Sequence, residues 1–204
     1  MKSSSPCYIA LEGAEACGKS THAARLAAEF DAVLTRETGG TAIGARIRAI
    51  LHDTEVTDLA DRAEALLTAA DRAQHLHQVV LPALAAGRHV VSDRSVHSTL
   101  AYQGYGRGLD VDELRHINGW AVQGTWPHLV VLLDVDPAVQ AGRMHGRELD
   151  RFEREDDAFH QRVRQGFTTM AAADPDRWAV VDASGPLDAV YAAIRAIVRD
   201  RVGL

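Results

Sequence analysis

The sequence has little cysteine and no long apolar run, and both absences narrow the class of protein. Only two cysteines, Cys7 and Cys17, occur among 204 residues, too few for a disulfide framework, so we expect both thiols to be reduced. No apolar run approaches the roughly 20 residues that span a bilayer. The first residues, Met1 to Pro6, are polar and do not resemble a signal peptide. We therefore expect a cytoplasmic protein without a membrane partner.

An excess of positive charge is also missing. The formal net charge is −6 at pH 7, whereas a general nucleic-acid binder normally has a basic balance or a basic face. We therefore expect no nucleic-acid partner, and any polyanionic ligand has to be held by arginines that the fold gathers locally. The candidates are Arg36, Arg72, Arg94, Arg143, Arg147, Arg151 and Arg154.

The order of apolar runs predicts a single α/β domain over residues 1–204. Short apolar runs alternate with longer stretches of helical periodicity, which is typical of a parallel sheet covered by helices on both faces. Asp58–Ala86, stopped by Gly87, and Asp110–Gln123 each predict a helix. Five runs predict five parallel strands: Tyr8–Leu11, Ala32–Leu34, His89–Val91, Leu129–Leu133 and Trp178–Val181.

A phosphate-binding loop follows the first predicted strand. The segment reads G-A-E-A-C-G-K-S and precedes a helix-like stretch. Its glycines let backbone N–H groups turn inward toward an anion, and the helix adds partial positive charge. Lys19 would then reach the outer phosphates of a nucleoside triphosphate, and the Ser20 hydroxyl would bind Mg²⁺. The predicted triphosphate site comprises Gly13, Ala14, Glu15, Ala16, Cys17, Gly18, Lys19, Ser20 and Thr21.

Other polar residues follow the later strands. Open parallel sheets bind ligands at the C-terminal ends of their strands, so Arg36–Thr41, Asp93–Arg94 and Asp134 should meet the phosphate loop at one edge. We expect Asp93 to share the Mg²⁺ shell with Ser20. Arg94 is expected to hold a phosphate of the acceptor, because a planar guanidinium matches phosphate oxygens in pairs.

Residues 142–157 carry six acidic residues and four arginines, which predicts a mobile, solvated segment. Phosphoryl transfer depends on positioning and on neutralising charge on the transferred group. We therefore expect this segment to be a lid that closes over the triphosphate and supplies arginines from the same chain. Arg147 and Arg151 are the catalytic candidates, and Arg143 is expected to bind the triphosphate.

The residues alone leave the acceptor open. A phosphate monoester has a second pKa of about 6, arrives ionised and needs no general base. A sugar hydroxyl would need a carboxylate base, for which Glu37 is the candidate. None of the ten histidines lies in a motif that demands a base, so we expect His75, His77 and His97 to be surface or helix-packing residues.

Several segments together resemble bacterial thymidylate kinase, which makes dTDP from dTMP and ATP. The run Ala-Tyr-Gln-Gly at residues 101–104 is the most specific of them. The resemblance implies a P-loop kinase fold, Mg²⁺-dependent transfer from ATP, and a homodimer. The matching segments, in family order, are Gly13–Thr21, Thr35–Thr41, Ala69–Gln74, Asp93–Arg94, Ala101–Gly108, Leu133–Pro137 and Leu149–Glu153.

The resemblance also implies how dTMP is bound. Glu15 would contact the deoxyribose 3′-hydroxyl, and Arg72 would read the thymine edge. Arg94 and Arg36 would hold the monophosphate. The remaining residues implied to line this site are Thr68, where the family commonly has a larger side chain, Thr99, Tyr102, which would crowd the 2′ side of the sugar, and Gln103.

The phosphate loop has Ala16 where eukaryotic-type members of the family have a catalytic arginine, so the lid must supply that charge.

Two enzymatic alternatives accompany this reading. The first is a deoxynucleoside kinase, which phosphorylates a sugar hydroxyl, because the segment Asp93–Ser98 is also similar to the arginine motif of that group. The second is a kinase whose acceptor is a related pyrimidine deoxynucleotide in place of dTMP. A GTPase-like switch would carry an Asn-Lys-x-Asp motif, which is absent. The sequence favours a dTMP kinase.

Overall fold

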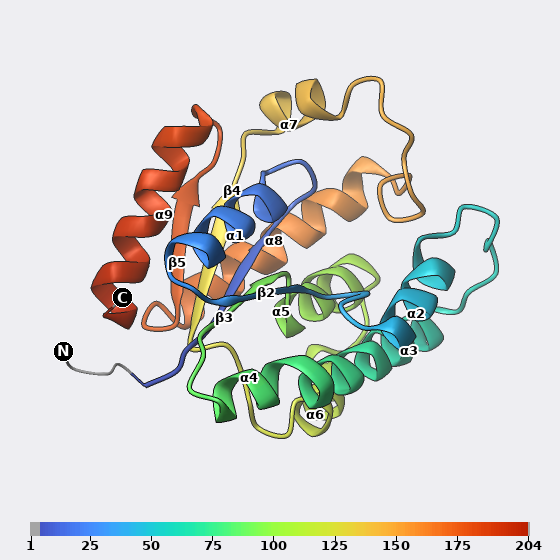
Figure 1. The fold of residues 1–204 in the computed structure, drawn as a ribbon. Coiled ribbons are helices and arrows are strands. Elements are labelled where there is room, and N and C mark those ends of the chain that lie inside the picture. Colours follow the sequence, from blue (N-terminus) through green and yellow to red (C-terminus); the bar gives the residue numbers. More distant parts are fainter. Residues whose placement is uncertain (1–4, 204) are drawn as a thin grey trace.

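A five-stranded parallel sheet forms the centre of the protein (Figure 1). The computed structural model describes residues 5–203. Neighbouring strands pair in the order β2-β3-β1-β4-β5, and every pairing is parallel. The predicted α/β fold and its five strands are therefore confirmed. The strands are β1 (Tyr8–Gly13), β2 (Val33–Arg36), β3 (Val90–Asp93), β4 (Leu129–Asp134) and β5 (Trp178–Asp182).

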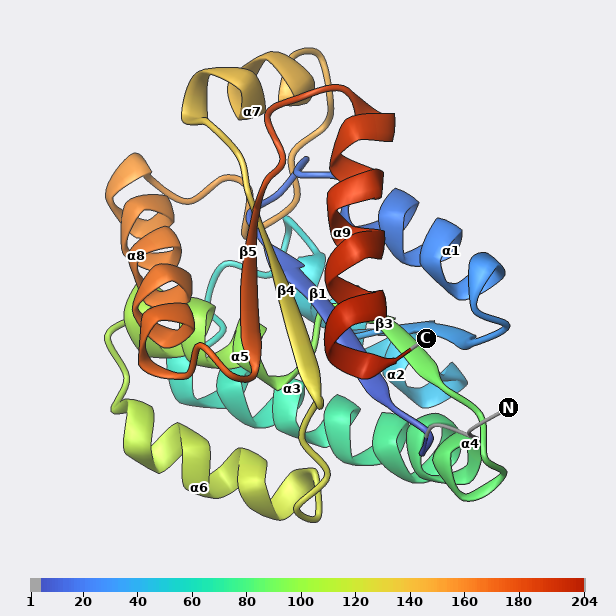
Figure 2. The ribbon, with the colours of Figure 1, turned by 90° about the vertical axis from the view of Figure 1, so that its left-hand side faces the viewer.

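Helices cover both faces of the sheet, as Figure 2 shows. On one face lie α1 (Lys19–Glu29) and α9 (Leu187–Val202). The other helices are α2 (Ala42–His52), α3 (Asp61–His75), η1 (Leu76–Val80), α4 (Leu81–Ala85), α5 (Val96–Thr99), η2 (Leu100–Gly106), α6 (Val111–Ala121), α7 (Pro137–Met144) and α8 (Asp157–Ala173), where η1 and η2 are π-helical. Within residues 5–203, none of the helices combines the length and the apolar character needed to cross a membrane.

The long helix predicted over Asp58–Ala86 is present in three joined parts. Helix α3 begins at Asp61 and continues through the π-helical turn η1 into α4, which ends at Ala85. Gly87 then adopts a φ of +76°, a left-handed conformation that glycine reaches without a steric penalty. The predicted stop signal is confirmed.

Strand β4 explains why these strands read as unbroken apolar runs. Val131 and Leu133 pack with the residues of α1 and α9, whereas Val130 and Leu132 pack on the opposite face with Phe167 of α8. Because successive side chains point to opposite faces and both faces are covered, every position from Leu129 to Leu133 is buried and apolar.

His97 packs inside the domain although its ring can titrate. The ring is 5% exposed and meets Trp178 edge to face, with ring centroids 4.8 Å apart. Burial, reinforced by the charges of Arg177 and Arg72, lowers the pKa of His97 to about 3. The packing role predicted for this histidine is confirmed.

This burial makes stability depend on pH. The unfolded chain binds a proton below the ordinary histidine pKa of 6.5, whereas folded His97 stays neutral, so its contribution is lost as the pH falls. Between pH 6.5 and 5 we expect the free energy of unfolding to fall by about 2 kcal/mol from this residue. His97→Gln should flatten that slope in urea denaturation, and exposed His116→Gln should not. Equal slopes in wild type and His97→Gln would contradict the assignment.

Candidate active site

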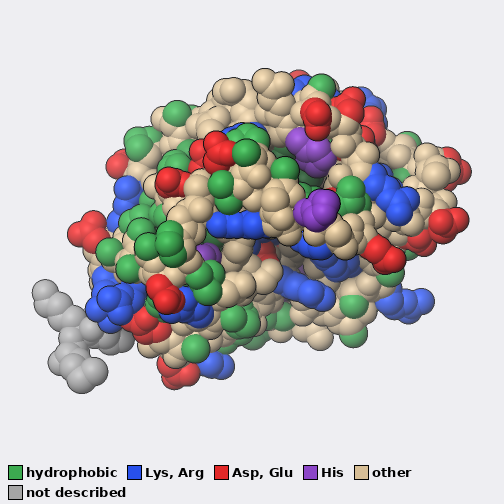
Figure 3. Space-filling view, turned by 90° about the horizontal axis from the view of Figure 1, so that it is seen from above, with side chains coloured by type: hydrophobic (Ala, Val, Ile, Leu, Met, Phe, Trp, Pro, Cys, Tyr) green, Lys and Arg blue, Asp and Glu red, His purple; other side chains and the backbone are tan. Residues whose placement is uncertain are grey.

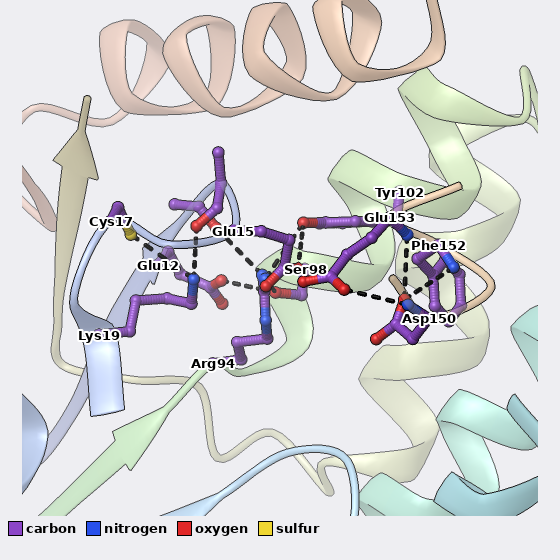
Figure 4. Close-up of polar contacts among 12 residues, drawn as sticks. Glu12, Glu15, Cys17, Lys19, Arg94, Ser98, Tyr102, Asp150, Phe152 and Glu153 are labelled. Atoms are coloured by element: carbon purple, nitrogen blue, oxygen red, sulfur yellow. Dashed lines mark hydrogen bonds and ion pairs between the residues drawn. The ribbon is translucent and has the colours of Figure 1, made fainter. Parts of the chain in front are cut away.

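The loop between β1 and α1 has the geometry of an anion cradle. Gly13 and Gly18 have φ values of +140° and +95°, and a Cβ on Gly13 would lie 2.5 Å from the Leu133 carbonyl oxygen. Helix α1 has no side-chain cap and no acidic residue in its first turn, so its N–H groups remain free for an anion. Lys19 Nζ donates to the Ala14 carbonyl at 2.6 Å and lies 3.5 Å from Cys17 Sγ (Figure 4).

A polar cavity lies in front of this loop. Lys19, Ser20 and Thr21 line it from the loop side, and Arg36 and Asp93 line it from the ends of β2 and β3. We call it the phosphate cavity. The predicted convergence on the phosphate loop is confirmed for Arg36 and Asp93. Asp134 lines neither this cavity nor the pocket beside it and pairs with Arg164 at 2.8 Å. Seen from above, basic side chains gather around the hollow in this face (Figure 3).

The Ser20 hydroxyl and the Asp93 carboxylate lie in hydrogen-bond contact at 2.5 Å. Both groups offer hard oxygen ligands, which is the donor set that suits Mg²⁺. Within residues 5–203 no group of three or more His, Cys, Asp or Glu side chains could hold a metal. Mg²⁺ commonly takes only one or two protein ligands and completes its shell with phosphate oxygens and water.

A second pocket adjoins the first and has a partly apolar wall. Leu51, at the end of α2, and Phe152 contribute to it. Of the residues that the family resemblance implies for dTMP, Arg36 alone lies outside this pocket, because its exposed side chain at the end of edge strand β2 faces the phosphate cavity. We call the pocket the acceptor pocket. It is lined by Glu15, Thr68, Arg72, Arg94, Thr99, Tyr102 and Gln103.

The two cavities share a wall. Five residues line both, so a ligand in one reaches the ligand in the other. All five have charged side chains, and the two that can pair with phosphate are the guanidinium groups. The shared residues are Glu15, Glu37, Arg48, Arg94 and Asp150.

Arg94 stands at the centre of this wall (Figure 4). It has a left-handed backbone, with φ of +70°, which an ordinary residue adopts at a cost of about 1 kcal/mol or more. Its Nη2 pairs with Glu15 and donates to the Tyr102 hydroxyl at 3.1 Å. Burial alone would raise the pKa of Glu15, but Arg94 and Lys19 outweigh it and lower that pKa to about 2. Glu15 is therefore ionised at every physiological pH.

A buried carboxylate that sequence reasoning missed supports Arg94 from behind. Glu12 is 0% exposed and accepts hydrogen bonds from the backbone N–H and hydroxyl of Ser95 and from the Ser98 hydroxyl at 2.6 Å. Ser98 Oγ in turn accepts from Arg94 Nη1 at 3.1 Å. Burial raises the pKa of Glu12. The one signal in the sequence was a charged residue inside an apolar strand, directly before the loop.

Glu37 forms a closed, buried network instead of facing a substrate hydroxyl as a free base. Its two oxygens accept from Arg72 Nε and from the His75 ring, each at 2.8 Å. Burial opposes ionisation, but Arg72 and His75 prevail and lower the pKa of Glu37. A carboxylate with both oxygens engaged and a lowered pKa is a poor proton acceptor. The candidate base of the sugar-hydroxyl alternative is thus already occupied.

Two further residues at the shared wall were not among the predicted site residues. Arg48, on α2, contacts the Thr38 carbonyl at 3.3 Å. Burial lowers the pKa of Arg48, and the charges of Arg36 and Arg94 lower it further. A cluster of guanidinium groups that repel one another favours an anion between them. At the mouth of the acceptor pocket, Asp150 contacts the His52 ring at 2.7 Å.

The predicted lid is only partly solvated. Phe152 and Glu153 are buried, at 8% and 9% exposure, so the expectation of a solvated segment is wrong for this part. The aromatic ring packs in the apolar cluster under the acceptor pocket, next to Tyr102. One apolar residue in a charged stretch was enough to dock it.

The lid arginines lie in three different environments. Arg143 donates to carbonyl groups of the phosphate loop and of the segment after β5, namely Ala16 and Ala183. Arg147 lines the phosphate cavity and is half exposed. Arg151 lies elsewhere, paired with buried Glu64 at 2.6 Å. Its predicted catalytic role stays a prediction that this geometry does not favour, because Arg151 would have to leave Glu64 to reach a phosphate.

Comparison with known proteins agrees with this geometry. The family model described as thymidylate kinase matches residues 11–194. The chain is 47% identical over 204 residues to a thymidylate kinase of Solidesulfovibrio magneticus, covering 94% of this chain and 98% of the relative. It is 44% identical over 201 residues to a thymidylate kinase of Bifidobacterium longum, with coverage of 95% and 97%.

A solved structure is similar as well. The crystal structure of thymidylate kinase from Ehrlichia chaffeensis superposes with a TM-score of 0.79 at 27% sequence identity, covering 95% of this chain and 98% of that one. A match of the family model over most of the chain, together with relatives of this identity, shows the family directly. The chain belongs to the thymidylate kinase family.

Proposed function

We propose that the protein transfers the γ-phosphoryl group of ATP to dTMP, giving dTDP and ADP. Family membership supports this reaction, and one observation carries it: the phosphate cavity and the acceptor pocket share a wall that contains Arg94 and Arg48. Two nucleotides bound in these cavities would meet end to end through their phosphates. In-line phosphoryl transfer needs that arrangement.

The donor is held by the phosphate loop. Lys19 binds the outer phosphates, and backbone N–H groups at the start of α1 bind the others. Arg147, which already lines the phosphate cavity, neutralises charge on the transferred group. Arg143 clamps the donor side, because its guanidinium bridges the phosphate loop and the segment after β5.

The acceptor is held from the opposite side. Arg94 and Arg48 bind its phosphate, with Arg36 at the rim of the cavity. Tyr102 and Glu15 contact the sugar, and Arg72 with Gln103 faces the base. The acceptor phosphate ionises on its own with a pKa of about 6, so transfer requires no general base.

Mg²⁺ would be bound by Ser20 and Asp93 together with phosphate oxygens. When bound, it neutralises charge on the donor phosphates. Ser20 and Asp93 contribute the oxygen ligands that fix its position beside the loop. We also place the reaction in the cytoplasm, where both nucleotides are available to a free enzyme.

A coupled ADP-release assay across dTMP, dUMP, dCMP, GMP, AMP and thymidine tests the reaction. We expect dTMP to be the preferred acceptor and thymidine to be inert, because Glu37 is engaged with Arg72 and His75. Turnover of thymidine without turnover of dTMP would overturn the proposal and establish a deoxynucleoside kinase.

We also propose a homodimer formed through α2, α3 and α6. These neighbouring helices expose large apolar side chains, including Ile43, Ile50, Leu66 and, at 82% exposure, Trp120. An apolar set of this kind on adjacent helices is typical of an interface.

Trp120→Lys is expected to weaken this dimer. Removing a central aromatic residue from an interface typically costs about 2 kcal/mol, so we expect the dissociation constant to rise roughly 30-fold. Sedimentation equilibrium measures it. Val180→Lys, which replaces an exposed apolar residue of β5, is the matched control and should leave association unchanged. Monomeric wild-type protein at all concentrations would contradict the proposal.

A further inference from the structure

Glu64, on α3, is a buried carboxylate beside the acceptor pocket, and it takes no part in the proposed binding of ATP, dTMP or Mg²⁺. Its side chain is 0% exposed. Its Oε2 accepts from Arg151 Nη2 at 2.6 Å and from Arg107 Nη2 at 3.1 Å. Its Oε1 accepts from the side-chain amide of Gln103 at 2.8 Å. A carboxylate with two guanidinium partners and an amide is fully paired and held rigidly.

The contact with Glu64 fixes the orientation of the Gln103 amide. A carboxylate between two guanidinium groups offers only acceptor oxygens, so the amide group that faces it has to be the NH₂. The carbonyl oxygen Oε1 of Gln103 therefore points away from Glu64. The opposite orientation would place two acceptor oxygens, those of Gln103 and Glu64, against each other in a buried site, which is costly.

That carbonyl oxygen opens on the acceptor pocket. In the described part of the chain, the buried side-chain atoms without a hydrogen-bond partner are His22 Nδ1 and Asp71 Oδ2. Gln103 Oε1 is not among them although no described group donates to it, so it is accessible rather than sealed in protein. Gln103 lines the acceptor pocket, which is the space available to it.

Arg72 gives the same pocket a hydrogen-bond donor. A guanidinium has five N–H donors, and Arg72 uses three, to Glu37, Asn118 and the Ser95 carbonyl. Two N–H groups of Arg72 remain, so the pocket presents a donor from Arg72 and the acceptor of Gln103 to a base. Thymine and uracil carry the complementary pair, a carbonyl O4 and an N3–H, whereas cytosine carries an amino group and a bare N3, which is the reverse pattern.

We propose that Glu64 determines base specificity: by holding the carbonyl of Gln103 toward the pocket, it makes the site select an imide pyrimidine, thymine or uracil, over cytosine. This inference rests on the proposed transfer to a pyrimidine deoxynucleotide. Glu64 touches no substrate, so it is a positioning residue that acts through Gln103. An unmatched buried polar pair is costly, and sites of this kind reject the wrong partner strongly.

Glu64→Gln tests the proposal. An amide at position 64 can donate as well as accept, so Gln103 becomes free to turn its NH₂ toward the pocket. We expect the ratio of kcat/KM for dTMP to that for dCMP to fall at least about tenfold. Arg107→Gln is the matched control. Arg107 donates to both Glu64 oxygens, so this variant removes a cation from the carboxylate but leaves the Gln103 amide its acceptor, and its ratio should equal that of wild type. An unchanged ratio in Glu64→Gln, or an equal fall in Arg107→Gln, would overturn the proposal.

The swap Glu64→Gln with Gln103→Glu is the rescue. The new amide donates to the new carboxylate, whose second oxygen again offers only an acceptor to the pocket, so the preference for dTMP should return. A purely structural role for Glu64 predicts no return. If Glu64→Gln does not fold, Gln103→Leu replaces it, and a retained ratio there overturns the proposal. Wild-type protein that phosphorylates no pyrimidine nucleotide would instead refute the proposed function.

Discussion

Replacing Lys19 by alanine is expected to lower kcat about a thousandfold or more, because a preorganised cation at the transferred phosphate is worth several kcal/mol in the transition state. The loop holds this side chain through the Ala14 carbonyl, with Nζ at 2.6 Å. Lys2 is the only other lysine in the chain, so no second lysine can take its place.

The fold of Lys19→Ala should survive. Within residues 5–203, no carboxylate lies within salt-bridge distance of Lys19. Glu15, whose pKa Lys19 helps to lower, keeps its direct pairing with Arg94 when Lys19 is removed. Circular dichroism and the midpoint of thermal unfolding check this, alongside kcat and the KM for each substrate. Near-normal turnover in a folded Lys19→Ala protein would contradict the role assigned to the loop.

A second measurement reads the same residue without a mutation. Because the chain contains only Lys2 and Lys19, acylation by an amine-reactive reagent followed by peptide mass spectrometry reports on Lys19 individually. We expect ATP to suppress acylation of Lys19 and to leave Lys2 unaffected, which makes Lys2 the internal control. Acylation of Lys19 at the same rate with and without ATP would place the triphosphate elsewhere.

The phosphate loop could be predicted from sequence because its chemistry lies in consecutive residues. Gly13 and Gly18 adopt positive φ values that glycine reaches easily, and the spacing to Lys19 follows from the chain itself. The strand ends were predictable for a related reason: parallel strands bring their C-terminal ends to one edge, so Arg36 and Asp93 had to converge.

The residues that were missed depend on packing between distant segments. Arg48 reaches the shared wall only because α2 packs on α3, and no local pattern marks it. Asp150 meets His52 only because Phe152 anchors the lid in the core. Arg151 shows the converse, since its pattern predicted a phosphate ligand and the buried carboxylate of Glu64 binds it instead. Tertiary contacts thus decide which lid arginine lines the phosphate cavity: Arg147 does, and Arg151 is held by Glu64.

Replacing Arg94 is expected to impair use of dTMP while sparing ATP. The guanidinium lines both cavities and contacts Glu15, Tyr102 and Ser98. Loss of a buried bidentate phosphate contact costs about 3 to 4 kcal/mol, so we expect kcat/KM for dTMP to fall by roughly 10² to 10³ in Arg94→Ala. The KM for ATP should stay within about twofold of wild type, since the donor is held by the loop.

Stability has to be separated from binding in this variant. Arg94 is the cation that offsets the charge of Glu15, and Arg94→Ala leaves that carboxylate unpaired, which lowers the thermal midpoint. Arg94→Lys keeps the charge but loses the planar fork, so it should retain stability and still lose most of its use of dTMP.

Arg36→Ala completes the comparison. Its side chain is exposed at the end of an edge strand and lines the phosphate cavity but not the acceptor pocket, so we expect a smaller rise in the KM for dTMP and no change in stability. A buried, bidentate phosphate site requires a definite order in the loss of kcat/KM for dTMP. The loss should be largest in Arg94→Ala, smaller in Arg94→Lys and smallest in Arg36→Ala. If Arg94→Ala changed only the affinity for ATP and left the KM for dTMP unchanged, Arg94 would contact the donor alone. That result would show that the shared wall does not hold the acceptor.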